Sequence, residues 1–232
     1  MVSFGYHQSN ADHTLFIKKR ATQLTILIVY VGVISQFMHA PKTNHVDAAH
    51  RILRYLKSSP GSGILFSPNS CLDIEVYTDA DWAGSIDDRR STSGYCSLIG
   101  GNLVTWRSKK QQVVARSSAE AEFRAMAHGV CEGLWLRFLM SDLGLVEETP
   151  IRLYCDNKAA ISIAHNPVQH DRTKHIEVDR HFIKENIEKG VVCTPFVPSE
   201  RQLADILTKG LHGSNFDRIV IKLGMINISR PT

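Results

Sequence analysis

Four acidic residues stand where carboxylates commonly do chemistry. Asp79 and Asp156 each follow a short apolar run that is typical of a buried strand, whereas Glu122 lies early in a long helical pattern. Asp205 lies in a short helical run near the end of the sequence. Parallel strands present their carboxyl ends along one edge of an open sheet, where ligands bind. If the helices reach that edge, the four carboxylates can hold two divalent cations against a phosphodiester and hydrolyse it.

Four carboxylates in one place need positive charge between them. Two like charges about 4 Å apart repel by about 4 kcal/mol at an effective dielectric constant of roughly 20, and some of the acids would otherwise take up protons. A ligand set made of oxygen atoms suits Mg²⁺ or Mn²⁺ and not zinc. We therefore predict two Mg²⁺ ions as cofactors, with Mn²⁺ as the alternative.

Each acid also has an ordinary explanation when it is taken alone. An aspartate after a strand is commonly a turn or capping residue, which would account for Asp79 or Asp156. An acid early in a helix is favoured by the helix dipole, which would account for Glu122 or Asp205. Spacing alone therefore leaves the metal site as a hypothesis.

The elements that must position these acids follow from periodicity and breakers. Residues 67–232 read as strands at 71–78, 94–99, 103–106, 151–155 and 191–197, and as helices at 118–140, 157–165, 175–188 and 202–209. Ser117 with Glu120 three residues later resembles a capping box. This order predicts an α/β domain, a mixed sheet with helices packed on it.

Residues 1–66 differ from the rest and form a predicted small α+β unit. Two strands are expected at 14–17 and 24–33, followed by a helix with apolar residues at helical spacing and Asn44 as its N-cap. The breakers between Ser58 and Gly63 end that helix. We therefore place a domain boundary between residues 66 and 67.

Composition sets wider limits. The chain has 232 residues, 43% of them hydrophobic and 22% charged, which is typical of a globular protein. Its five cysteines include no close pair, which disfavours a disulfide framework or a zinc knuckle. The longest apolar run, Leu24 to Ile34, is far shorter than the roughly 20 residues of a membrane helix. With no targeting segment evident, we expect an intracellular protein, cytoplasmic or nuclear, with no membrane partner.

Six sequence blocks, in order, carry a specific family resemblance. They are Tyr77-Thr78-Asp79-Ala80-Asp81-Trp82-Ala83-Gly84, Arg89-Arg90-Ser91-Thr92-Ser93-Gly94-Tyr95, Ser117-Ser118-Ala119-Glu120-Ala121-Glu122-Phe123, Tyr154-Cys155-Asp156-Asn157, Thr173-Lys174-His175-Ile176 and Leu203-Ala204-Asp205-Ile206-Leu207-Thr208-Lys209. Over residues 68–225 the chain resembles the ribonuclease H domain of copia-type retrotransposon polyproteins. The resemblance implies a ribonuclease H-like mixed five-stranded sheet flanked by helices. It also implies hydrolysis of the RNA strand of an RNA–DNA hybrid, with Asp79, Glu122, Asp156 and Asp205 as the catalytic and metal-binding acids.

Two neighbouring acids compete for these roles. We prefer Glu122 to Glu120, because the family's acid precedes a bulky residue and because Glu120 suits the capping box. Asp81 is expected to lie just outside the ligand set. Cellular members of the wider family carry a histidine in the loop before the last acid, whereas residues 196–200 contain none and offer Glu200 in its place.

The expected partner is a nucleic acid, recognised through its backbone geometry and 2′-hydroxyl groups. Candidate phosphate contacts are Arg89, Arg90, Arg107, Lys109, Lys110, Arg116, Arg172 and Lys174. Trp82 and Trp106 could stack on sugars or bases, although core packing is the simpler role. The net charge of +4 does not decide the partner by itself, and the sequence does not report an oligomeric state.

Residues 4–66 resemble two separated parts of a copia-type reverse transcriptase. Leu24 to Val31 is similar to the strand before the polymerase's catalytic aspartates, but Gly32 and Val33 stand where those aspartates are expected. Polymerase chemistry needs these metal ligands, so we predict a truncated remnant without polymerase activity.

Three alternatives stay open at this point. The chain could be a remnant that binds nucleic acid without cutting it, which the damaged N-terminal part and the missing loop histidine favour. It could be a transposon fossil that does not fold stably. A nuclease of the integrase type is less favoured, because such enzymes use three acids without this set of flanking blocks.

Overall fold

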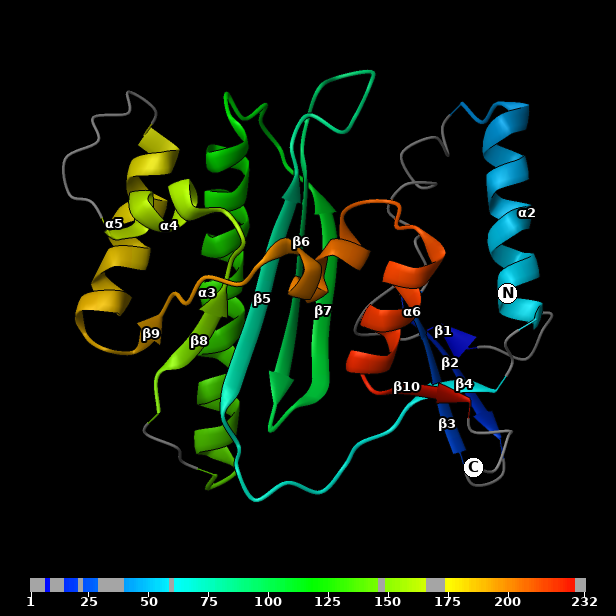
Figure 1. Ribbon diagram of the computed structural model, residues 1–232, viewed down its shortest axis with the longest axis horizontal. Coiled ribbons are helices and arrows are strands. Elements are labelled where there is room, and N and C mark those ends of the chain that lie inside the picture. Colours follow the sequence, from blue (N-terminus) through cyan, green and yellow to red (C-terminus); the bar gives the residue numbers. More distant parts are fainter. Residues whose placement is uncertain are drawn as a thin grey trace. The chain divides into compact units, whose positions relative to one another are not determined.

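The computed structural model describes residues 7–8, 15–20, 23–28, 40–58, 61–145, 149–165 and 174–227 (Figure 1). The chain divides into two compact units. One comprises residues 1–66 together with 220–232, and the other comprises residues 67–219. The predicted acids all belong to the second unit.

The second unit is built on a mixed five-stranded sheet. Its strands are β5 (Ile74–Asp81), β6 (Thr92–Ile99), β7 (Asn102–Lys110), β8 (Ile151–Tyr154) and β9 (Val192–Cys193), in the order β7-β6-β5-β8-β9. The β5-β6 and β6-β7 pairs are antiparallel, and the β5-β8 and β8-β9 pairs are parallel. The predicted mixed five-stranded sheet of an α/β domain is confirmed.

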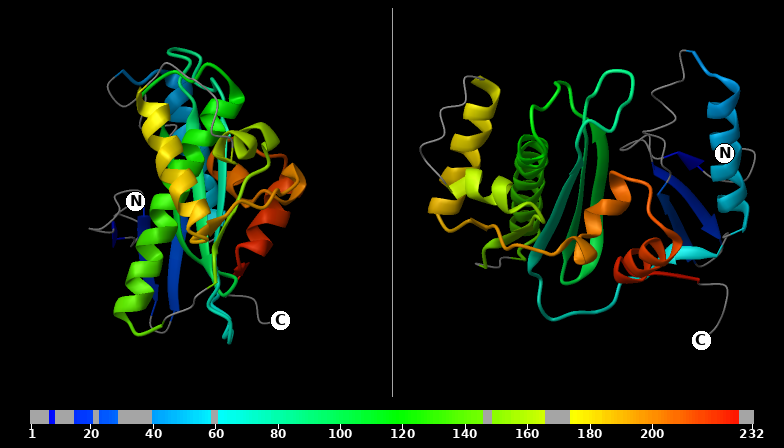
Figure 2. Two further views of the ribbon diagram at one scale, coloured as in Figure 1. Left: turned by 90° about the vertical axis from the view of Figure 1, so that its left-hand side faces the viewer. Right: turned by 45° about the horizontal axis from the view of Figure 1, so that its top comes forward.

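Helices and short turns cover the two faces of this sheet. The helices are α3 (Ser118–Asp142), α4 (Lys158–His165) and α5 (Lys174–Glu188), and the 3₁₀ turns are η2 (Ser199–Arg201) and η3 (Leu203–Leu207). Helix α6 (Gly213–Lys222) comes after η3 in the chain, and its last residues belong to the first unit. Figures 1 and 2 show α3 and α5 on one side of the sheet and the segment 199–207, in orange, crossing β5 and β6 on the other. The layers therefore place α3, which carries Glu122, and η3, which carries Asp205, on opposite sides of the sheet.

The start of α3 follows its predicted capping sequence. Ser117 has extended backbone angles and its hydroxyl oxygen accepts a hydrogen bond from the Glu120 backbone N–H at 3.1 Å. Glu120 Oε2 reaches back to accept from the Arg116 N–H, one residue further than in the standard capping box. Glu120 Oε1 pairs with the Arg124 guanidinium at 3.0 Å. Both carboxylate oxygens of Glu120 are thus engaged at the helix start.

A glycine lets α3 approach the sheet closely. A methyl group at Gly129 would lie 2.5 Å from Thr78 Cγ2 and 2.7 Å from Leu153 Cδ1. These side chains belong to the buried core of the unit, which includes Val76, Phe123, Met126, Val130, Ile151, Leu153 and Ile183. This close packing of the α3 backbone at Gly129 against Thr78 also fixes the distance between the N-terminal turns of α3 and the second half of β5.

Replacing Gly129 by alanine is expected to destabilise the protein. Alanine gains about 1 kcal/mol of helix propensity over glycine, but overpacking a closed core costs about 1–3 kcal/mol. Since the added methyl group meets two fully buried side chains, we expect the upper part of this overpacking range and so a net loss of up to about 2 kcal/mol, seen as a lower midpoint in thermal melting. The exposed Ser141→Ala on the same helix is the control; an unchanged midpoint for Gly129→Ala would contradict this account.

The first unit contains two small sheets and a helix. Strands β1 (His7–Gln8), β2 (Leu15–Arg20) and β3 (Gln23–Ile28) form one antiparallel sheet, and β4 (Ser62–Ile64) pairs with β10 (Met225–Asn227). Helix α2 spans Thr43–Ser58, so Asn44 lies inside the helix, and the prediction that it is the N-cap was wrong. The part of the expected strand that follows Ile28, residues 29–33, lies outside the described residues.

Several element boundaries differ from expectation. β5 continues to Asp81, because β6 pairs with it as far as the Asp81–Thr92 register, so Asp79 lies within the strand and not at its end. The expected strand at 191–197 is reduced to β9 plus a single bridge between Cys155 and Phe196. The expected last helix is the 3₁₀ turn η3, followed by α6, which the periodicity did not predict.

None of the helices in the described residues combines the length and the apolar content needed to cross a membrane.

Candidate metal centre

The structure brings the four predicted acids together at one place. Oxygen atoms of Asp79, Asp156 and Asp205 lie within 4.8 Å of one another. A second group, with ligand atoms equally close, is formed by Glu122, Cys155 and Asp156. Asp156 belongs to both groups, so its carboxylate stands between the other acids.

Asp79 is held by the segment that crosses the sheet. Its side chain is almost fully buried, and the Thr208 hydroxyl donates a hydrogen bond to Asp79 Oδ2. Thr208 also donates to the Asp205 backbone carbonyl at 3.2 Å. One threonine thus ties the β5 carboxylate to the turn that carries Asp205.

Glu122 reaches the cluster from the first turns of α3. Its side chain is buried, and Glu122 Oε2 has no hydrogen-bond partner among the described residues. Burial, together with the charges of Asp79 and Asp156, raises the pKa of Glu122 to about 9, although a hydrogen bond from the Ala80 backbone N–H works against this shift. Glu122 therefore has an oxygen atom that lacks a positive partner.

Asp156 lies just beyond β8, after the bridge residue Cys155, and is oriented by a loop. The Ser199 hydroxyl donates a 2.6 Å hydrogen bond to Asp156 Oδ2. Ser199 lies in the loop where the sequence lacks a histidine and where Glu200 was the expected substitute. Glu200 is exposed, whereas the neighbouring serine makes the contact with the acid.

Asp205 is positioned by the buried Gln202, which fastens η3 to β5. Gln202 Nε2 donates to the Thr78 carbonyl at 2.9 Å, and its Oε1 accepts from the Ala204 N–H. The turn packs against the sheet at Gly94, where a methyl group would lie 2.7 Å from Thr208 Cγ2. Burial and the charge of Asp79 raise the pKa of Asp205 to about 6.

A lysine enters the cluster beside these acids. Lys209 Nζ lies 2.9 Å from Asp205 Oδ1 and 3.7 Å from Asp79 Oδ1. Burial works to lower the pKa of Lys209, but the charge of Asp79 and the hydrogen bond with Asp205 outweigh it and raise the pKa, so the ammonium stays charged at neutral pH. Lys209 ends the last of the six sequence blocks, where no role was predicted for it.

Glu120 and Asp81, the two acids that compete for ligand roles, differ in what their carboxylates contact. Glu120 is committed to the start of α3, as described above, whereas Glu122 points to Asp156 and Cys155. Asp81 is half-buried at the end of β5, where burial and then the charge of Asp79 raise its pKa. Geometry therefore favours Glu122 over Glu120 as a member of the cluster and leaves Asp81 beside it.

The residues present fit a site for hard divalent cations. The four carboxylates supply oxygen ligands, and oxygen atoms of the three aspartates lie within 4.8 Å of one another. In addition, the buried Oε2 of Glu122 has no hydrogen-bond partner among the described residues. Among the described residues, Cys155 offers a sulfur atom beside Glu122 and Asp156, but burial and then the charge of Glu122 raise the pKa of its thiol, which makes it a poorer ligand than the carboxylates. The donor set suits Mg²⁺ or Mn²⁺ better than zinc.

The metal-free cluster should lose stability as the pH rises. Because the pKa of Glu122 is raised in the folded state from 4.5 to about 9, the unfolded chain gives up this proton first, and folding is penalised as the pH rises from about 4.5 toward 9. Glu122→Gln removes the penalty. In EDTA at pH 8 we expect its melting midpoint to exceed that of the native protein by about 4 °C or more, with the difference vanishing below about pH 4. Equal midpoints at both pH values would contradict this.

The predicted phosphate contacts lie mainly around the loop between β5 and β6 and along β7. Arg89 and Arg90 are exposed in that loop, where Asp88 pairs with Arg90 at 3.6 Å and with Lys110 at 2.9 Å. Arg107 and Lys109 are exposed on β7, an edge strand, and Arg116 is exposed before α3. Arg172 lies outside the described residues, and Lys174 begins α5. As binding residues, all eight stay a prediction.

The two tryptophans differ in exposure. Trp82 is 49% exposed, and its indole N–H donates to the Ala115 carbonyl at 3.0 Å. Trp106 is half-buried and lies opposite Cys96 in the sheet. Trp82 thus joins the loop after β5 to the loop before α3, and part of its ring is free for contact.

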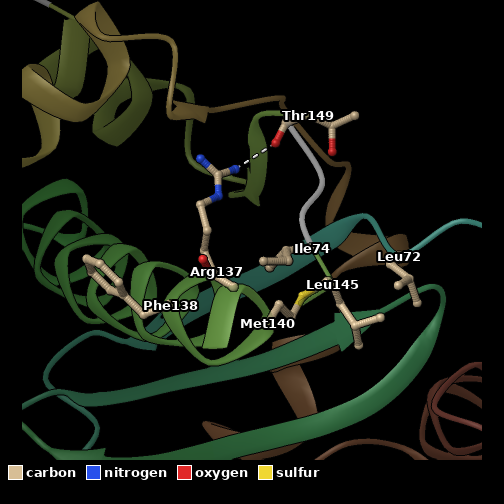
Figure 3. A pocket seen from close by; sticks show the side chains of 8 residues that line it. Leu72, Ile74, Arg137, Phe138, Met140, Leu145 and Thr149 are labelled. Carbon is tan, nitrogen blue, oxygen red and sulfur yellow. Dashed lines mark hydrogen bonds between the residues drawn. The ribbon is translucent and has the colours of Figure 1, made fainter. Parts of the chain in front are cut away.

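A pocket of about 280 Å³ lies elsewhere on the unit (Figure 3). It is lined by Leu72, Ile74, Arg137, Phe138, Met140, Ser141, Leu145 and Thr149, and Arg137 donates a 2.6 Å hydrogen bond to the Thr149 carbonyl beside it. The lining residues lie at or before the start of β5 and in or beyond the C-terminal part of α3, whereas Asp79 lies in the second half of β5 and Glu122 in the first turns of α3. The pocket is therefore separate from the acid cluster.

Known proteins similar to this chain are transposon polyproteins. It is 42% identical over 198 residues to the retrovirus-related Pol polyprotein from transposon RE1 of Arabidopsis thaliana, which covers 85% of the chain and 14% of that protein. It is 41% identical over 198 residues to the polyprotein from transposon RE2 of the same plant, with the same coverage. It is 36% identical over 195 residues to the one from transposon TNT 1-94 of Nicotiana tabacum, covering 84% of the chain. The chain thus spans about a seventh of the length of these relatives.

Solved structures resemble it more loosely. A ribonuclease H1 named LC11, solved in complex with an RNA/DNA hybrid, has a TM-score of 0.42 and 15% identity, and covers 59% of this chain and 94% of that one. The ribonuclease H1 of Halobacterium salinarum has a TM-score of 0.41 and 15% identity, and covers 63% and 98%. No protein-family model matches the chain. With 42% identity to the RE1 polyprotein over 85% of its own length, the chain is homologous to one segment of the Pol polyproteins of copia-type retrotransposons.

Proposed function

We propose that residues 67–219 form a metal-dependent endonuclease that hydrolyses the RNA strand of RNA–DNA hybrids. The single observation that supports this proposal most strongly is the convergence of Asp79, Glu122, Asp156 and Asp205, from four separate elements, on one place. Isolated acids at strand ends and helix starts have ordinary explanations, but those explanations do not require four of them to meet. Homology to one segment of transposon Pol polyproteins makes nucleic acid the natural substrate.

The proposed roles follow from the two groups that share Asp156. The three aspartates would hold one divalent cation, and Glu122 with Asp156 would hold the other. Divalent ions bound there would supply a water of lowered pKa and neutralise charge on the leaving oxygen. Thr208 and Ser199 orient two of the carboxylates, and Gln202 keeps the turn of Asp205 against β5. The site would then act mainly by positioning and electrostatics.

The hybrid would be recognised through its backbone. The exposed arginines and lysines of the β5–β6 loop and of β7 offer charge to phosphates without reading bases. Arg89 adopts a positive φ of 55° in that loop, which is a backbone conformation that arginine rarely takes. The partly exposed ring of Trp82 lies beside this loop and can pack on a sugar.

For residues 1–66 we propose a reverse-transcriptase remnant that lacks polymerase activity. The reason is chemical: a glycine and a valine stand where two metal-binding aspartates are expected. Extension of a primer on an RNA template by the purified chain would overturn this part of the proposal.

The decisive assay uses the full chain and a hybrid with a labelled RNA strand. With Mg²⁺ we expect the RNA strand to be cut and the DNA strand and a matched RNA duplex to be left intact, and with EDTA we expect no cutting. Binding of the hybrid in a gel shift without cleavage, under any divalent ion, would instead select a binding remnant without catalysis.

A further inference from the structure

Lys209 places a positive charge inside the acid cluster. Its ammonium lies 2.9 Å from Asp205 Oδ1 and 3.7 Å from Asp79 Oδ1. The lysine side chain is 40% exposed, whereas the two aspartate side chains are only 10% and 2% exposed. The buried carboxylates are thus neutralised from their more exposed side by a cation that belongs to the protein.

The backbone leaves this lysine little freedom to be elsewhere. Lys209 follows Asp205 by four residues, and its backbone N–H donates to the Asp205 carbonyl at 3.1 Å. Residues four apart in a helical turn face each other. The preceding residue, Thr208, is buried and bonded to Asp79. The chain is therefore anchored on both aspartates immediately before the lysine.

The lysine faces one of the two ligand groups more than the other. Asp79 and Asp205, its two partners, are two of the three aspartates whose oxygens lie within 4.8 Å of one another. On Glu122, in the other group, the lysine charge acts more weakly than the charges of Asp79 and Asp156. A cation that binds the aspartate group must therefore meet a positive charge already present.

We propose that Lys209 is an internal counter-ion that competes with a divalent cation for Asp79 and Asp205 and so sets the ion concentration that the site requires. This inference rests on the proposed function, because it assumes that the acids bind divalent ions. Without an ion, Lys209 offsets the repulsion among the aspartates. When an ion binds, the two positive charges repel at short range, so the Lys209–Asp205 ion pair has to loosen.

Calorimetric titration of the metal-free full chain with Mn²⁺ tests this directly. We expect Lys209→Met to bind Mn²⁺ about three- to five-fold more tightly than the native protein, since a partly exposed ion pair of this kind is worth up to about a factor of five. Lys209→Arg keeps the charge and should bind as the native protein does. The matched control is Lys189→Met, which removes an i,i+4 lysine that pairs with Glu185 at 2.6 Å on α5, away from the cluster.

Thermal melting supplies a second readout that does not depend on activity. In EDTA, Lys209→Met should melt at a lower temperature than the native protein, because the aspartates lose their counter-ion. Saturating Mn²⁺ should then raise the melting midpoint of Lys209→Met by more than it raises the midpoint of the native protein. Adding Asp156→Asn should abolish the Mn²⁺ heat in both backgrounds, which assigns that heat to this site.

The outcomes separate the two proposals. If Lys209→Met binds Mn²⁺ no more tightly than the native protein while the hybrid is still cut, the competition is overturned and the proposed nuclease stands. If neither protein binds Mn²⁺ and neither cuts the hybrid, the metal site and the competition fall together.

Discussion

Replacing Asp156 by asparagine is expected to lower the rate of RNA-strand cleavage by about 10³-fold or more. Asp156 is the one acid that belongs to both ligand groups, so its loss removes an anionic oxygen from each. A thousand-fold loss corresponds to about 4 kcal/mol of transition-state stabilisation, which is a reasonable cost for disabling a two-ion site. The measurement is single-turnover cleavage of a labelled hybrid at saturating Mg²⁺.

This variant should keep its fold, which makes the test clean. Asparagine has the shape of aspartate, and its amide oxygen can still accept the hydrogen bond of Ser199. Removing one negative charge also relieves repulsion in the metal-free cluster, so the melting midpoint in EDTA should not fall. The matched control is Asp142→Asn, the same chemical change at an exposed position at the end of α3. Cleavage by Asp156→Asn within about ten-fold of the native rate would rule out its role as a shared ligand.

Replacing Gly94 by alanine is expected to lower cleavage by about 10²-fold, although Gly94 carries no functional group. Its added methyl group would lie 2.7 Å from Thr208 Cγ2 and 2.9 Å from Leu207 Cβ, closer than such contacts normally come. The turn must therefore move away from β6, and it carries Asp205 with it. A displacement of about 1 Å in a catalytic site can cost about 10²-fold in rate.

The effect should be local and should be visible without catalysis. We expect Gly94→Ala to weaken Mn²⁺ binding in calorimetry, while its melting midpoint falls by only a few degrees, because the core between α3 and the sheet is untouched. Gly210→Ala, just beyond Lys209, is the control, since a methyl group there meets nothing within 4 Å. Cleavage and Mn²⁺ affinity equal to those of the native protein would show that the turn tolerates the methyl group.

Element types and the candidate acids were predictable because they depend on local pattern. Alternation of apolar residues predicted β5 and β8, and a 3.6-residue period predicted α3 and α5. Capping chemistry placed the start of α3 correctly, since Ser117 and Glu120 are three residues apart and act within one turn. Element boundaries were less predictable, because the length of a strand depends on how far its neighbour pairs with it. The strand expected at 191–197 keeps only two paired residues and a bridge.

Local patterns along the chain predicted which four acids were candidates and the elements that carry most of them, and the motif blocks predicted the resemblance to a family. How those acids are held follows from contacts between distant segments: Thr208 bonds Asp79 from 129 positions away, Gln202 bonds the Thr78 carbonyl from 124 away and Ser199 bonds Asp156 from 43 away. The pairing of Lys209 with two of the acids likewise appears only in the folded chain. Such contacts depend on how β5, α3 and η3 pack against one another, and packing between distant segments leaves no periodic or local signal in the chain.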